Sequence, residues 1–189
     1  MAIPPIMPAP SIAGHIAAVG YEFYIEMLEQ AIQTLKGESI EEEWEPEVRV
    51  RAAALIPEAY VPDPGLRLSL YKRLASTSDE DRLADLREEL RDRFGPVPEP
   101  LQHLFLIIAL KLKLKQLGIQ KLEISDRELG LVLSPRGPWK VERLVALIKK
   151  EPRVYQLRGE GKLAVTLKEE GRGLESAEGV LTRLDLLLA

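Results

Sequence analysis

Apolar residues recur every three to four positions through most of the N-terminal part of the chain, which is the spacing of amphipathic helices. Asp63 followed by Pro64 is typical of a helix start, Ser78 is a candidate cap for the next helix, and Gly95 is typical of a helix end. The helices predicted from these signals cover residues 15–36, 64–76, 79–94 and 99–117.

Two short stretches in this part of the chain follow other patterns. Residues 48–51 alternate between apolar and basic residues, as a half-buried strand does, and Pro57 and Pro62 exclude a helix in the segment that follows. Residues 110–114 alternate leucine with lysine, which also fits a strand, but the length of the surrounding apolar pattern favours a helix.

The C-terminal part contains short stretches with a strand-like pattern, and stretches with the apolar spacing of helices lie between and after them. Strands are predicted over 119–124, 129–133, 154–157 and 163–167, and helices over 138–150 and 173–188. The fold class is therefore α+β: a helix-rich N-terminal half followed by a small mixed or antiparallel sheet with packed helices. Residues 1–13 contain four prolines and no periodicity, so we assign them to a disordered linker or a remnant foreign to the domain, and residues 14–189 to one domain.

Composition removes several classes of function. The 189 residues include no cysteine and only two histidines, His15 and His103, so a zinc or thiol site is not expected. The apolar run from Leu104 to Leu110 is too short to cross a membrane, and no signal peptide precedes it, so we expect a cytoplasmic protein without a membrane partner. The net charge of −4 argues against nucleic acid as the main ligand.

No catalytic, cofactor-binding or metal-binding residue is predicted. The stretch Gly159-Glu160-Gly161-Lys162 resembles a phosphate loop, but Leu163 stands where a serine or threonine is needed, and a strand follows instead of a helix. A hairpin turn is the better interpretation. We therefore expect that the chain itself is not an enzyme and holds no cofactor.

Two clusters of charge remain as candidate binding surfaces. On a helix over 79–94, acidic side chains fall opposite the apolar side, and they would suit a basic partner. These acidic residues are Asp85, Glu88, Glu89 and Asp92. The only basic cluster in the sequence is a low-ranked candidate for nucleic-acid contact, and a solvated face is the stronger interpretation. It consists of Lys111, Lys113, Lys115 and Lys121.

Three segments resemble one family: residues 14–24, with the pattern GHI…VGY; residues 55–76, with LIPEAYVPD and LYKRLAS; and residues 89–98, with EL-DRFGPVP. Their order and spacing are similar to those of the C-terminal domain of bacterial transcription-repair coupling factors (Mfd), over residues 14–125. The resemblance implies a regulatory domain of an ATP-dependent DNA translocase that couples transcription to nucleotide excision repair. ATP would bind in motor domains that this chain lacks.

The same resemblance implies partners and interface residues. In the family, this domain packs on the UvrB-like module of its own parent chain and masks the surface that binds UvrA. RNA polymerase and double-stranded DNA are further partners of the parent. Acidic residues before the Phe-Gly of the third motif face that module, and they match Glu89 and Asp92 here, with Asp85 and Glu88 beside them. Arg91 stands where the family pattern tends to be apolar. The alternative is an accessory nucleic-acid-binding module of the same translocase.

Overall fold

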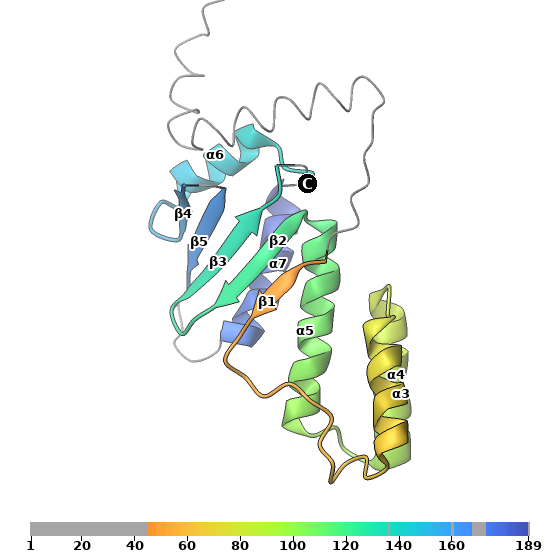
Figure 1. The fold of residues 1–189 in the computed structure, drawn as a ribbon. Coiled ribbons are helices and arrows are strands. Elements are labelled where there is room, and N and C mark those ends of the chain that lie inside the picture. The colour runs from red at the N-terminus through yellow and green to blue at the C-terminus, as the bar shows by residue number, and fades with distance from the viewer. Residues whose placement is uncertain (1–44, 136, 160, 168–172, 189) are drawn as a thin grey trace, which may run out of the picture.

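The computed structural model describes residues 45–135, 137–159, 161–167 and 173–188. The predicted linker over 1–13 and the predicted helix over 15–36 lie outside these ranges. Elements are numbered as in Figure 1. The described helices are α3 (Pro64–Ala75), α4 (Glu80–Phe94), α5 (Glu99–Gln116), α6 (Val141–Lys150) and α7 (Gly173–Leu188). The described strands are β1 (Glu47–Arg49), β2 (Ile119–Ile124), β3 (Glu128–Leu133), β4 (Tyr155–Arg158) and β5 (Lys162–Thr166).

Local signals at the helix ends have the predicted effect, with one exception. The Asp63 carboxylate accepts a hydrogen bond from the Leu66 N–H at 2.6 Å, which caps α3. Helix α4 begins one residue later than expected, because Asp79 is its cap and Ser78 instead hydrogen-bonds to the Asp79 side chain. Gly95, with a φ of 88°, ends α4 in a conformation that only glycine adopts easily.

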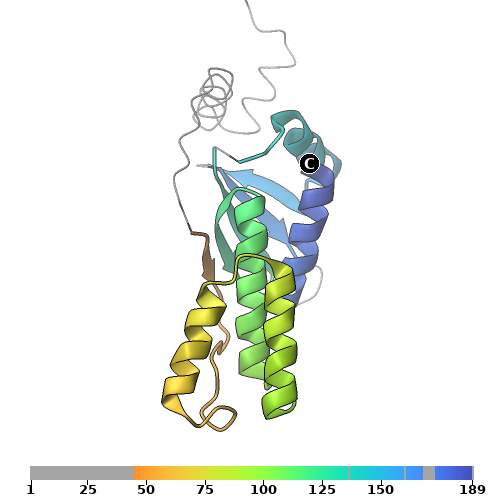
Figure 2. The same ribbon diagram turned by 90° about the vertical axis from the view of Figure 1, so that its right-hand side faces the viewer.

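The five described strands form one mixed sheet in the order β1-β2-β3-β5-β4. Strand β1 runs parallel to β2, and the other neighbours are antiparallel. In β3 every second residue is buried, so one face of the sheet faces the core and the other carries a mixture of polar and small or partly buried residues. Helices α5 and α7 cover the apolar face, as Figures 1 and 2 show. The α+β class is confirmed, and so is the predicted order of elements over the part of the chain that the structure describes.

Helix α5 joins two separate hydrophobic cores. Its N-terminal residues Leu101 and Phe105 pack with the buried leucines of α3 and α4. Its C-terminal residues Leu110 and Leu114 pack with the sheet, α6 and α7. The leucine–lysine alternation at 110–114 is therefore helical, because one continuous helix is needed to serve both cores. Figure 2 shows α3 and α4 projecting along the end of α5 that extends beyond the sheet.

The predicted boundaries shift by a few residues in the C-terminal part. Helix α6 begins at Val141, not at Pro138, because Trp139 packs into the core just before the helix. The glycine-rich stretch does join two antiparallel strands, and Gly161 has a φ of 67° in that turn. The hairpin interpretation is confirmed, and the segment leads into β5, where a phosphate loop would need a helix.

Candidate interaction surface

The predicted acidic residues occupy the outward side of α4. Its inward side carries Leu83, Leu86 and Leu90, none more than 6% exposed. The acidic set lies on the opposite side, as the helical spacing of about 100° per residue predicts. We call Asp85, Glu88, Glu89 and Asp92 the acidic face of α4.

Glu89 is already held within the domain. Arg73 of α3 donates two parallel hydrogen bonds to its carboxylate, from Nη1 at 2.9 Å and Nη2 at 2.6 Å. Arg93, one turn further along α4, donates a third at 2.9 Å. The Arg73 hydrogen bonds, helped by Arg93 and opposed by desolvation, lower the pKa of Glu89 from 4.5 to about 2. Glu89 therefore stays ionised and fixed in position at any physiological pH.

The other three carboxylates have fewer or weaker ion pairs within the domain than Glu89 has. Glu88 pairs with Arg91 across one turn, and both side chains are 54% exposed. Asp92 is 72% exposed and has Arg91 Nη2 at 3.4 Å. Asp85 is exposed and forms no ion pair with another described residue. The acidic face thus combines Glu89, which two arginines hold, with two more accessible aspartates: Asp85 has no ion pair among the described residues, and Asp92 has a single 3.4 Å contact to Arg91.

The end of α4 is anchored by the segment before α3. The Tyr60 hydroxyl lies 2.9 Å from the carbonyl oxygens of both Leu90 and Gly95, and its ring packs against Phe94 at a centroid distance of 5.7 Å. The Arg93 guanidinium lies 5.2 Å from the centre of the same Phe94 ring. The motif residues of segments 55–76 and 89–98 therefore meet around the C-terminal half of the acidic face, and their contacts hold the end of α4 in place.

The predicted basic cluster is not one surface. Lys113 pairs with Asp185 of α7 at 2.8 Å, and Lys121 pairs with Glu123 at 2.7 Å. Residues two apart on a helix point in nearly opposite directions, so Lys113 does not share a side of α5 with Lys111 and Lys115. Nucleic-acid contact by these lysines stays a prediction, and the structure shows that Lys113 and Lys121 already have carboxylate partners within the domain.

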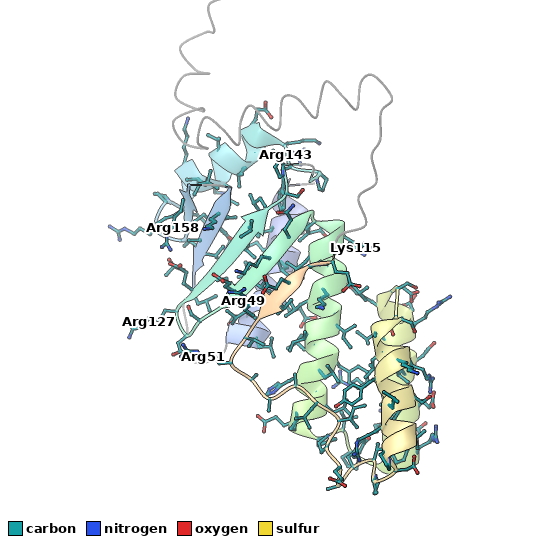
Figure 3. All side chains as sticks on the ribbon, viewed as in Figure 1. Arg49, Arg51, Lys115, Arg127, Arg143 and Arg158 are labelled. Atoms are coloured by element: carbon teal, nitrogen blue, oxygen red, sulfur yellow. The ribbon has the colours of Figure 1, made fainter. Side chains whose placement is uncertain are left out.

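A second basic region was missed from the sequence. Helix α6 and the turn after it expose four basic side chains that form no ion pair with another described residue. We call them the α6 basic surface: Arg143, Lys149, Lys150 and Arg153. Figure 3 shows Arg143 at the end of the molecule where α6 lies. The amphipathic pattern of residues 138–150 contained this signal, because the buried leucines leave the basic residues on the outward side.

Comparison with known proteins identifies the family. The model of the TRCF domain matches residues 50–144, which is half of the chain and includes the whole of α3, α4 and α5. The chain belongs to the TRCF domain family. The resemblance predicted from the sequence motifs is thereby confirmed.

Relatives of this TRCF domain are large proteins. The transcription-repair-coupling factor of Escherichia coli is 34% identical over 156 residues, which are 80% of this chain and 14% of the relative. That of Myxococcus xanthus is 32% identical over 161 residues, which are 85% of this chain and 13% of the relative. The chain therefore spans about a seventh of the length of these relatives.

A solved structure shares the fold. The crystal structure of the C-terminal domain of a transcription-repair coupling factor superimposes with a TM-score of 0.60 at 18% identity, covering 77% of this chain and 97% of that one. This identity supports the fold alone.

Among the described helices of the TRCF domain, none is long and apolar enough to cross a membrane.

Proposed function

We propose that this TRCF domain is the regulatory, autoinhibitory part of a transcription-repair coupling factor. The acidic face of α4 docks on a basic surface of the UvrB-like module of the same parent chain and masks the surface that binds UvrA. The parent is an ATP-dependent DNA translocase that acts on stalled RNA polymerase, and this domain restrains its motor without catalysing a reaction itself. The acidic face of α4 is the observation that carries the proposal.

The carboxylates of the acidic face differ in how far they are already paired within the domain, and this difference supports docking on a basic partner. Glu89 already has two arginine partners, so it adds less attraction to a further cation than an unpaired carboxylate would. Asp85 and Asp92 have exposed side chains and keep most of their charge available. We therefore assign the direct ionic contacts mainly to the two aspartates, and to Glu89 the role of fixing Arg73 and Arg93 at the edge of the interface.

Rigidity favours the same role. A surface that needs no rearrangement loses little conformational entropy on docking. The Tyr60 hydroxyl and the Glu89 pairs join α3, α4 and the preceding segment into one unit. The face can therefore dock and release without unfolding, as a reversible restraint requires.

Arg91 weakens the charge of this face locally. Its guanidinium lies between Glu88 and Asp92 and contacts both carboxylates. Docking of a basic surface would compete with Arg91 for these carboxylates, so we expect the restraint to be weaker than that of a face without this arginine. The replacement Arg91→Leu should then tighten the restraint, because it frees both carboxylates.

The test uses the intact parent protein with the double replacement Asp85→Arg and Asp92→Arg. Reversing two open charges should lower the affinity of the domain for its docking surface. Coupling between sites is typically worth about 5–150-fold, so we expect basal ATP hydrolysis and UvrA binding each to rise at least about fivefold.

The matched control is Asp126→Arg with Glu178→Arg, which makes the same change of charge on exposed residues outside α4. This control should leave both activities at the level of the unmodified protein. If the two double variants behave alike, or if neither activity rises in the α4 variant, the acidic face is not the restraining contact.

A further inference from the structure

The α6 basic surface lies at the opposite end of the molecule from the acidic face. Helix α6 packs over one end of the sheet, whereas α3 and α4 flank the far end of α5 (Figure 1). The inward side of α6 carries Leu144, Val145 and Leu147, none more than 5% exposed. The orientation of α6 is therefore fixed by its apolar side, and its charged side must face outward.

Helix stability explains only part of this surface. Lys149 and Lys150 lie in the last turn of α6, where a positive charge interacts favourably with the helix dipole. Arg143 lies in the first turn, where the same dipole disfavours a positive charge, and it has no compensating ion pair with another described residue. Arg153 lies beyond the helix in the turn before β4. Neither Arg143 nor Arg153 is therefore accounted for by the stability of the helix.

The cations are spaced along one exposed side of α6. Arg143 and Lys150 are seven residues apart, so they lie on the same side of α6 about 10.5 Å apart along its axis. Ala146 lies between them on that side and leaves the space over the helix open. Glu142 is the single acidic residue on the described outward side of α6. An elongated polyanion could contact both cations at once.

The character of the surface selects the class of partner. Protein interfaces concentrate aromatic and apolar anchors and are depleted in lysine. The described outward side of α6 has no apolar side chain larger than Ala146, and two of its basic residues are lysines. Nucleic-acid interfaces are polar and strongly positive, as this one is. We propose that the α6 basic surface binds the phosphate backbone of duplex DNA without reading its sequence.

The local charge around α6 favours binding at this face. The segment 140–153 carries five basic residues against two acidic ones. DNA would therefore approach the end of the domain that carries α6 and leave the acidic face free for a basic partner.

The experiment titrates the 189-residue chain against a fluorescein-labelled duplex of arbitrary sequence and follows anisotropy as the salt concentration rises. Four phosphate contacts give a slope of about −3.6 for log K against log salt, so affinity should fall about 150-fold between about 50 and 200 mM. The variant Arg143→Gln with Lys150→Gln keeps two contacts, so its slope should be about −1.8 and its loss about 10-fold.

Two further variants separate this surface from general charge effects. Lys72→Gln with Arg87→Gln removes the same charge from exposed positions on α3 and α4, and it should keep the full slope. Glu142→Gln should raise the affinity, because it removes the acidic residue next to these cations. Equal slopes for the two double variants overturn the proposal, and so does an unlabelled polyglutamate peptide that displaces the duplex as well as unlabelled DNA does.

Discussion

The pairing of Arg73 with Glu89 should be measurable as a pH-dependent contribution to stability. The replacement Arg73→Gln removes the two parallel hydrogen bonds at 2.9 and 2.6 Å and leaves Glu89 with Arg93 alone. Exposed ion pairs contribute about 0.2–1 kcal/mol. The side chains of Arg73 and Glu89 are 47% and 33% exposed, so solvent screens them, but the bidentate geometry favours the upper end of that range. We expect a loss of about 1 kcal/mol at neutral pH.

The sign of the pH dependence follows from the lowered pKa of Glu89. Folding depresses this pKa from 4.5 to about 2, so the stabilisation is complete above pH 4.5 and is lost as the pH falls towards 2. The difference in unfolding free energy between the unmodified chain and Arg73→Gln should therefore shrink over that interval. Urea unfolding at several pH values, followed by the fluorescence of the buried Trp139, measures it.

The matched control for this prediction is Arg91→Gln. Arg91 pairs with Glu88 on the same helix, but both side chains are 54% exposed, so we expect a loss below about 0.5 kcal/mol. The reasoning fails if Arg73→Gln costs no more than Arg91→Gln at neutral pH. It also fails if the effect of Arg73→Gln persists undiminished in acid.

Two further replacements test the framework that supports the site. Gly118 has a φ of 63°, and a Cβ there would lie 2.4 Å from the Gly137 Cα, so Gly118→Ala should cost about 2–4 kcal/mol in urea unfolding. Gly159→Ala meets no atom within 4 Å and should change stability by less than about 0.5 kcal/mol; similar losses for both glycines would contradict the steric argument. Tyr60→Phe deprives two carbonyl oxygens at the end of α4 of their hydroxyl partner and should cost about 1 kcal/mol, seen as a lower Tm; an unchanged Tm would show that the hydroxyl does not anchor α4.

Much of the architecture was predictable because helix ends are encoded locally. The Asp63 cap and the terminating Gly95 act through hydrogen bonds and backbone angles within a few residues. The acidic face of α4 was predictable for the same reason, since the helical repeat alone places its carboxylates opposite the buried leucines. Residues 119–124 form β2 as predicted, because apolar residues interspersed with polar ones after a helix-ending glycine are a local signal.

Contacts between distant segments could not be obtained from spacing. Strand β1 pairs in parallel with β2, and Arg73 donates a hydrogen bond to Glu89. Both contacts depend on how distant elements pack against one another, and no local pattern encodes that packing. The lysines on α5 show the same limit. Neighbouring positions in sequence pointed to one basic surface, but packing against α7 and the sheet assigned Lys113 and Lys121 to separate acidic partners.

The sequence by itself therefore determined the helices, the fold class, the family motifs and the acidic face, because each depends on short-range chemistry. The tertiary structure alone decided which charges are already paired within the domain and which are open. It paired Glu89 with Arg73 and left Asp85 and the α6 basic surface without an ion pair among the described residues. The physical reason is that an ion pair depends on the distance between side chains, and packing sets that distance.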